Sequence, residues 1–139
     1  MKKVLYISYD GMTDPLGQSQ VLPYLSELTG LGYQFTLLSF EKKQRYLTQG
    51  KIIMDIAAKA GIKWEPMSFT TWPPLVSKAW DRWNMQRKAL SLHRLHNFDM
   101  IHCRSYASAE TGLWLKQKTS VKFLFDMRGF WVDERVDNG

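Results

Sequence analysis

The sequence contains a single cysteine, Cys103, among its 139 residues. One thiol cannot form an internal disulfide or supply the thiolates of a cysteine-based zinc site, so both kinds of stabilised fold are excluded. No apolar run approaches the roughly 20 residues that are needed to cross a bilayer. The N-terminal lysines are followed by only about six apolar residues before Asp10, too few for the core of a signal peptide. We therefore expect a soluble, cytoplasmic protein in which Cys103 is a small buried side chain.

Two nucleotide-binding signatures are also missing. Gly11 and Gly17 do not have the spacing of the G-x-G-x-x-G dinucleotide motif, and no G-x-x-x-x-G-K-[ST] loop occurs. The hypotheses of a nicotinamide dehydrogenase and of a P-loop NTPase therefore lose their main support.

Acidic residues are fewer than basic ones, because 19 Lys and Arg oppose 13 Asp and Glu for a net charge of +6. This balance favours an anionic partner, which is a phosphate-bearing substrate, an anionic lipid or a nucleic acid.

Short apolar strands alternate with amphipathic helices along the chain. We expect strands at 4–9, 35–40, 62–69, 98–103 and 122–126, and helices from about 18 to 30, around 52–60, over 76–96 and over 105–116. Such alternation is typical of right-handed βαβ units and a parallel sheet. It predicts one Rossmann-like α/β domain of three layers (α/β/α), with a five-stranded parallel sheet in the order 3-2-1-4-5. The stretch 127–139 is polar and shows no pattern.

Polar residues follow three of the expected strands, at the edge where open parallel sheets bind their ligands. They are Asp10 and Gly11 after the first strand, Arg104 and Ser105 after the fourth, and Asp126 and Arg128 at the end of the fifth. An arginine offers a planar fork that suits phosphate or carboxylate oxygens. The alternative is that both arginines pair with nearby aspartates and only tie loops together.

The glycine turn before the first helix is a second candidate. Free N–H groups at the start of a helix form an anion site, which would lie near Gly17 and Gln18. The alternative is a plain turn that needs no ligand. His102, inside the fourth strand, is either a core histidine with a hydrogen bond or a side chain that reaches the crevice.

The helix expected over 76–96 is strongly basic, with five Lys or Arg against one acid, Asp81. Its apolar residues on one side are Val76, Ala79, Trp80, Trp83 and Leu90. We interpret this stripe as the face that covers the sheet. The alternative is a basic helix that lies in a membrane interface through its tryptophans. His93 and His96 lie three residues apart, but nothing nearby completes a ligand set, so no metal is expected.

Three segments together resemble the N-terminal domain of family 4 glycosyltransferases with the GT-B architecture. They are 14–21 (DPLGQSQV), 99–105 (DMIHCRS) and 125–131 (FDMRGFW), and the second is similar to the family pattern D-x-[IV]-H-x-[HR]. The resemblance implies two Rossmann-like domains that face a cleft. The N-terminal domain, here residues 1–139, binds the acceptor, and a C-terminal domain binds a nucleotide-sugar donor. Members are typically retaining and metal-independent, so no cofactor is implied.

The resemblance also implies roles for individual residues. Gly17 and Gln18 correspond to the turn that approaches the donor diphosphate. The position after H-x in the fourth strand is commonly a histidine near the reacting sugar; here it is Arg104, to which we assign, with His102, a catalytic role or else anion binding. The residues assigned to the acceptor are Asp10, Gly11, Ser105, Asp126 and Arg128.

One departure from the family is large. The E-x7-E donor motif lies in the C-terminal domain, and no pair of glutamates with that spacing occurs here. We therefore expect an excised domain or a truncated reading frame that is inactive by itself. The expected partners are the nucleotide-sugar donor, a glycan or lipid-linked acceptor, the missing domain and, peripherally, the inner face of an anionic membrane.

Two other classes of function remain as alternatives. A non-enzymatic Rossmann-like binding or scaffold domain gains support if the native reading frame stops at Gly139 without donor-domain sequence. A nucleic-acid binder is suggested by the charge alone, since no helix-turn-helix, zinc or RNP-like signature accompanies it, and nucleic acid is not an expected partner. Polysaccharide assembly is one biological process in which such a transferase could act, but no residue of the sequence points to it in particular.

Overall fold

The computed structural model describes residues 2–15, 17–70 and 73–126. The elements are β1 (Lys2–Ser8), the π-helical turn η1 (Gly17–Val21), α1 (Leu22–Gly30), β2 (Tyr33–Glu41), α2 (Lys43–Ala60), β3 (Lys63–Ser68), α3 (Pro74–His96), β4 (Met100–Arg104), α4 (Ser105–Thr119) and β5 (Lys122–Asp126). Every predicted strand is present, and β5 has the predicted bounds.

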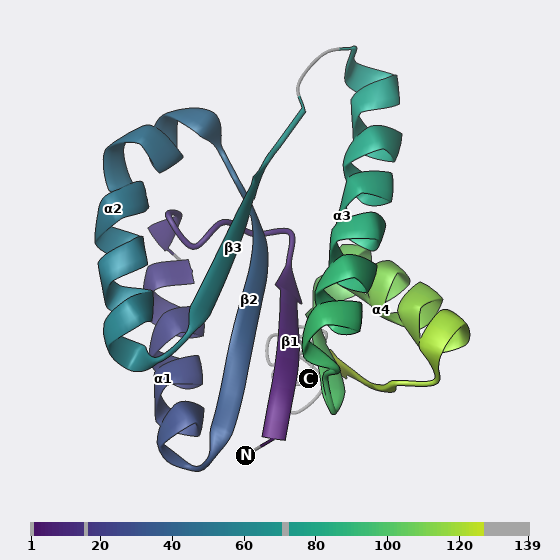
Figure 1. Cartoon of the computed structure of the whole chain (residues 1–139). Coiled ribbons are helices and arrows are strands. Elements are labelled where there is room, and N and C mark those ends of the chain that lie inside the picture. Colours follow the sequence, from purple (N-terminus) through teal and green to yellow (C-terminus); the bar gives the residue numbers. More distant parts are fainter. Residues whose placement is uncertain (1, 16, 71–72, 127–139) are drawn as a thin grey trace, which may run out of the picture.

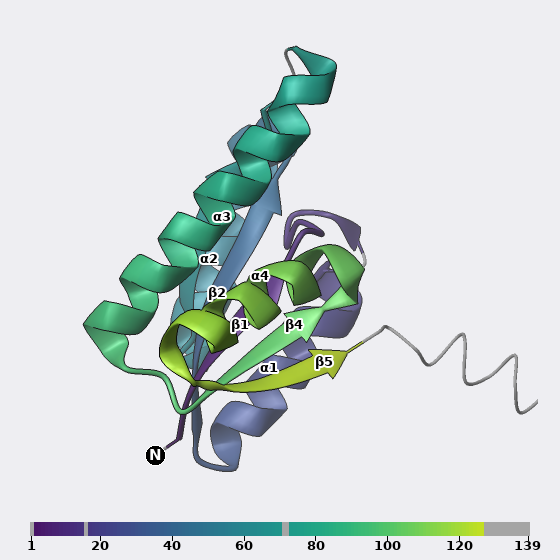
Figure 2. The same cartoon turned by 90° about the vertical axis from the view of Figure 1, so that its right-hand side faces the viewer.

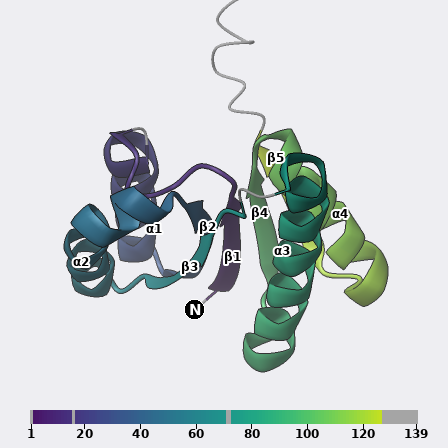
Figure 3. The ribbon, with the colours of Figure 1, turned by 90° about the horizontal axis from the view of Figure 1, so that it is seen from above.

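The five strands form one parallel sheet in the order β3-β2-β1-β4-β5, which confirms the predicted topology. Helices α1 and α2 cover one face and α3 and α4 the other, so the domain has three layers (Figures 1 and 3). The central strand β1 ends at Ser8, which lies opposite Ser39 of β2 and Arg104 of β4. The carboxyl ends of the strands therefore meet at one edge, where the loops toward α1 and α4 diverge.

The sheet has two hydrophobic cores because successive residues of a strand point to opposite faces. In β1, Val4 and Tyr6 pack with α1 and α2, whereas Leu5 and Ile7 pack with α3 and α4. All four side chains are buried. This burial on both faces is what a central parallel strand requires, and it explains why β1 reads as a continuous apolar run.

Helix α2 begins at Lys43, well before the apolar pattern from which we predicted it. Its buried stripe is short and consists of Gly50, Ile53 and Ala57. Ile52 and Ile56, which lie within the predicted range 52–60, are exposed. Its first turns lack an apolar period altogether, so the sequence pattern could not reveal them.

Helix α3 faces the sheet with a different side from the one that we predicted. Its buried face consists of Ser77, Asp81, Met85, Ala89 and Leu92. The predicted stripe is wrong, since Val76, Ala79, Trp80 and Trp83 are exposed and Leu90 is half-buried. Polar residues at the first two inward positions hide the periodicity. The first turns of α3 also extend past the rest of the body, at the carboxyl edge of the sheet (Figures 1 and 2).

Over the described part of the chain, no helix is both long and apolar enough to cross a membrane.

Gly112 on α4 packs against the sheet so closely that it has no room for a side chain. A Cβ at this position would meet the Cys103 sulfur and the Phe123 ring. We expect Gly112→Ala to lower the free energy of unfolding by about 1–3 kcal/mol, because overpacking outweighs the helix propensity that alanine adds. Gly30→Ala is the matched control, since a Cβ there meets nothing within 4 Å. Urea unfolding of both variants tests the expectation, and equal stability would contradict it.

Burial raises the pKa of the Cys103 thiol to about 12. The thiol is also fully shielded from solvent. Since the thiolate is the reactive species, we expect iodoacetamide to label Cys103 in urea but hardly at all in the native chain at pH 8. Rapid labelling of the native protein, detected by mass spectrometry, would show that the core between the sheet and helices α3 and α4 opens readily.

Candidate functional site

The loop that leaves β1 is held by a buried carboxylate. Glu41, at the end of β2, is only 1% exposed. Its oxygens accept hydrogen bonds from the backbone N–H groups of Met12 (2.8 Å) and Thr13 (3.0 Å), and from the hydroxyls of Thr13 (2.8 Å) and Ser39. The Trp64 indole N–H donates in turn to the Ser39 hydroxyl oxygen at 3.0 Å. Four donors thus compensate the burial of one charge and fix the loop on the sheet.

Two glycines allow this close packing. A Cβ at Gly11 would lie 2.7 Å from Glu41 Oε1, and one at Gly17 would lie 2.7 Å from Met12 Cα. The Gln18 amide N–H donates to the Asp14 carbonyl (3.1 Å), and its side-chain nitrogen donates to the Thr13 carbonyl (3.0 Å). In this conformation Gly17 and Gln18 therefore stabilise the loop itself, and their binding of a diphosphate stays a prediction.

Arg104, at the end of β4, joins three elements at the carboxyl edge. It is 4% exposed. Its Nε lies 3.5 Å from Asp10 Oδ2, and its Nη2 donates to Gln20 Oε1 of η1 at 3.3 Å. The backbone of Asp10 is fixed by Ser8, whose hydroxyl donates to the Asp10 carbonyl and accepts from the Asp10 N–H. The aspartate pairing that we gave as an alternative role for Arg104 is thus present, and Asp10 itself remains partly open to solvent.

His102 lies on the same face of β4, two residues before Arg104. It is buried, and its ring packs 4.6 Å from the Tyr6 ring and 6.4 Å from the Tyr24 ring of α1, measured between centroids. Of the two alternatives, the structure thus places His102 in the core beneath α1. Its interaction with a ligand stays a prediction.

Three buried polar atoms at this edge have no hydrogen-bond partner within the described residues. They are Arg104 Nε, Ser108 Oγ and Thr111 Oγ1. Ser108 and Thr111 lie on the inward side of α4, next to the end of β4. These atoms do not form one cluster, because Arg104 Nε lies 3.5 Å from Asp10 on the face that α1 covers, whereas Ser108 and Thr111 lie on the other face. The Thr111 hydroxyl also interacts with the Tyr9 phenol, so of the three only Ser108 Oγ is left without a polar interaction that the structure shows.

A cavity of about 360 Å³ lies at the carboxyl edge of the sheet. It is lined by Tyr9, Phe69, Thr70, Ser77, Lys78, Asp81, Arg82 and Ala107. These residues come from the loops after β1 and β3 and from the first turns of α3 and α4. The cavity thus lies at the carboxyl edge of the sheet, on the face that α3 and α4 cover.

The polar groups of the cavity are partly preorganised. Both Asp81 oxygens accept from the Thr70 N–H, at 2.9 and 3.1 Å. The Arg82 Nε lies 3.1 Å from Glu110 Oε2. Burial raises the pKa of the Tyr9 phenol above its ordinary value, although the neighbouring Thr111 hydroxyl and the Arg82 charge oppose the rise. The phenol therefore keeps its proton at neutral pH and can donate it to an acceptor oxygen in the cavity.

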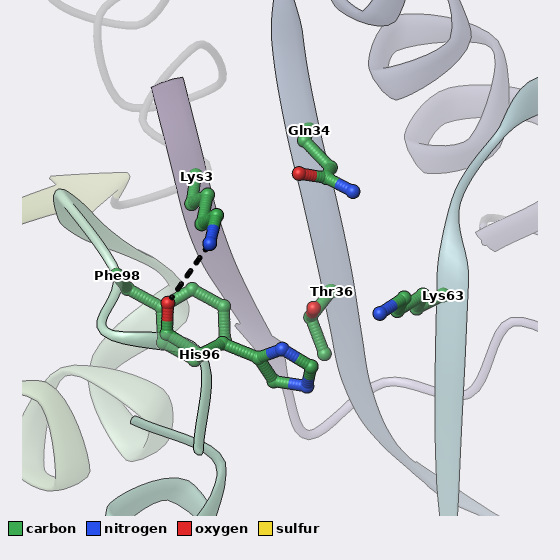
Figure 4. Close-up of a pocket in the computed structure, with 6 residues that line it drawn as sticks. All are labelled: Lys3, Gln34, Thr36, Lys63, His96 and Phe98. Carbon is green, nitrogen blue, oxygen red and sulfur yellow. Dashed lines mark hydrogen bonds between the residues drawn. The ribbon is translucent and has the colours of Figure 1, made fainter. Parts of the chain in front are cut away.

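A second, smaller pocket lies at the opposite edge, near the amino ends of the strands (Figure 4). Its volume is about 70 Å³, and it is lined by Lys3, Gln34, Thr36, Lys63, His96 and Phe98. Burial and the charges of Lys63 and Lys3 lower the pKa of His96. No group of three or more His, Cys, Asp or Glu side chains that could hold a metal ion is found in the described ranges.

The structure brings most of the predicted site residues to one edge. Asp10, Gly11, Gly17, Gln18 and Arg104 lie in or beside the loop after β1, whereas His102 lies opposite Tyr6 within the sheet. The backbone of Asp126 lies opposite Arg104 in the sheet, and Ser105 is the first residue of α4. Arg128 lies outside the described residues.

Sequence reasoning missed Glu41, Gln20 and the cavity. The signal for Glu41 was a charged residue directly after the apolar run 35–40, at a strand end. The cavity is formed by segments far apart in the sequence, and only Asp81, the one acid of a basic helix, marked it beforehand.

Comparisons with known proteins support the fold. No family model matches the chain, and no curated protein is similar to it. Among solved structures, the C-terminal domain of a hydrogenase from Pyrococcus furiosus matches with a TM-score of 0.66 and 15% identity over 90% of both chains. A glycosyltransferase from Rickettsia africae matches with a TM-score of 0.58 and 18% identity over 89% of this chain. The glycotransferase of kitacinnamycin matches with a TM-score of 0.61 and 11% identity over 88% of this chain.

The chain spans 29% of the length of each of these two glycosyltransferases. It therefore has the Rossmann-like fold of one part of such enzymes. The hydrogenase domain has this fold too, so the fold alone does not select an activity.

We expect Glu41→Gln to lower the free energy of unfolding by about 1–3 kcal/mol, because the new NH2 group faces N–H and O–H donors that lose their acceptor. Hydrogen exchange of the Met12 and Thr13 amides should accelerate most. Glu27→Gln, at an exposed position on α1, is the matched control. Unchanged exchange at Met12 and Thr13 would show that Glu41 does not hold the loop.

Proposed function

We propose that this chain is the acceptor-side domain of a GT-B glycosyltransferase. The enzyme transfers a sugar from a nucleotide-sugar to a glycan or lipid-linked acceptor, with retention of configuration and without a metal. The observation that carries the proposal is Arg104, a cation that is buried at the carboxyl edge of the sheet, where it pairs with the partly exposed Asp10. The resemblance of three sequence segments and the shared fold of two glycosyltransferases support it.

The cavity suits an acceptor sugar or its carrier. Its volume falls in the range of about 300–1,000 Å³ that small-molecule sites occupy. Tyr9 and Phe69 provide ring surfaces for the apolar face of a sugar. The Tyr9 phenol is a donor, and the Asp81 carboxylate, held by the Thr70 N–H, is an acceptor for sugar hydroxyls. Asp10, Gly11, Ser105, Asp126 and Arg128 remain our proposed acceptor-side residues.

On the donor side, the negative charge of the diphosphate must be compensated. When the sugar leaves its nucleotide, negative charge develops on the diphosphate, and fixed positive groups at that place stabilise the transition state. Arg104 is such a group, and the turn at Gly17 and Gln18 would approach the same diphosphate. His102, on the same face of β4, is the second residue to which we assign a catalytic role. The remaining donor contacts would come from a second domain, as the resemblance to the family implies.

The test uses this chain joined to the native sequence that follows it. We expect that protein to bind a nucleotide-sugar in calorimetry and to transfer the sugar. Arg104→Ala should lower kcat/KM about 10²–10³-fold, because one preorganised positive group is lost. Arg104→Lys should recover part of the loss, since the charge remains but the fork does not.

Arg94→Ala, at an exposed position of α3, is the control and should leave transfer unchanged. If Arg104→Ala lowers the free energy of unfolding in proportion to transfer, Arg104 only ties the loops together. If the longer protein binds no nucleotide-sugar, the non-enzymatic scaffold alternative replaces the proposal.

A further inference from the structure

The small pocket at the amino edge of the sheet is separate from the candidate site at the carboxyl edge. It lies between the first residues of β1, β2 and β3 and the end of α3, on the face of the sheet that α3 covers (Figure 4). The strands contribute Lys3, Gln34, Thr36 and Lys63, and the segment at the end of α3 contributes His96 and Phe98. We call this the amino-edge pocket.

The amino-edge pocket has an excess of positive charge. The Lys3 and Lys63 side chains lie on opposite sides of it (Figure 4), and neither forms an ion pair with a described carboxylate. Glu65, further along β3, pairs with Lys88 at 3.1 Å. Asp99 accepts a hydrogen bond from the backbone N–H of Lys3 at 2.8 Å. Neither of these carboxylates lines the pocket, whereas both lysines do.

The end of α3 opposes an anion only weakly. The last carbonyls of a helix together carry about half a negative charge. The Lys3 amino group donates to one of them, the carbonyl of His96, at 3.4 Å. The Lys63 amino group has no such partner among the described residues. Two full positive charges outweigh this half charge, so the pocket attracts anions.

Neutral donors complete the amino-edge pocket. Thr36 is only 4% exposed, and its hydroxyl has no hydrogen bond to another described residue. A buried hydroxyl without a partner costs free energy, which an acceptor bound in the pocket would recover. The lowered pKa of His96 keeps its ring neutral at pH 7, with one N–H to donate. The Gln34 amide is a further donor.

We propose that the amino-edge pocket binds a phosphate-type oxyanion, either inorganic phosphate or the phosphate of a small monoester. Lys3 and Lys63 would balance its charge, and Thr36 would donate to one of its oxygens. The volume of about 70 Å³ exceeds the roughly 10–15 Å³ that one water needs, and it is far below the ~300 Å³ of a site for a drug-sized ligand. The inference goes beyond the proposed function and does not depend on it.

The experiment is an NMR titration of the chain with inorganic phosphate, with chloride at equal ionic strength as the reference. We expect saturable shifts of the Thr36, Lys63 and Phe98 amides. Phosphate should also raise the pKa of His96 more than that of His93, since a bound anion favours the charged form of the nearer ring. Glycerol 3-phosphate is the second arm. Tighter binding than that of inorganic phosphate assigns the site to a monoester, and equal or weaker binding assigns it to the free anion.

Three variants separate a built pocket from general surface charge. Lys63→Gln should weaken phosphate binding about fivefold, because one charged contact is lost. Thr36→Val should weaken it about tenfold without lowering the free energy of unfolding, because the hydroxyl has no partner to lose in the free domain. Lys2→Gln is the matched control and should bind like the parent. Lys2 is exposed at the same edge, but it lies with Val4 on the face that α1 and α2 cover.

Thermal unfolding in chloride checks that each variant is folded. Absence of saturable shifts, or equal weakening by Lys2→Gln and Lys63→Gln, overturns the proposal, because only the overall charge of the domain would then attract phosphate. Unchanged binding in both Lys63→Gln and Thr36→Val overturns it as well. Because the titration contains no nucleotide-sugar, its failure leaves the transferase proposal standing, and failure of nucleotide-sugar binding leaves this inference standing.

Discussion

The buried carboxylate of Glu41 is the interaction on which the arrangement of the carboxyl edge depends. It brings the loop after β1 down onto β2 through two backbone N–H groups and the Thr13 hydroxyl, and Ser39 of β2 itself supplies a fourth donor. Because that loop is fixed, Asp10 stands where Arg104 can reach it, and η1 begins where Gln20 can accept from the same arginine. A charge buried on the second strand thereby sets the geometry of an arginine on the fourth.

The fold and the site support different conclusions about this protein. The same three-layer arrangement occurs in a hydrogenase domain and in two glycosyltransferases, so its topology reports how strands and helices bury their apolar faces. The proposal for function comes instead from Arg104, a cation that is buried at the carboxyl edge, and from the cavity on the face that α3 and α4 cover. These features cost stability unless something occupies them.

Much of the site could be predicted because the carboxyl ends of parallel strands must converge. Asp10 and Arg104 were found by position alone, and they do contact each other. The inward face of α3 could not be predicted. Its first inward residues are Ser77 and Asp81, whereas its most apolar residues, Trp80 and Trp83, face solvent. A rule that places apolar residues inside therefore pointed to the wrong side of the helix.

The sequence by itself determined the alternation of strands and helices, the order of the sheet and the edge at which polar residues gather. Those features follow from local periodicity and from the handedness of βαβ units, which need no knowledge of distant contacts. Only the tertiary structure decided that Glu41 holds the loop, that His102 packs beneath α1, and that α3 turns its tryptophans outward. Each depends on side chains that meet across separate elements, where burial, charge and space must be satisfied together.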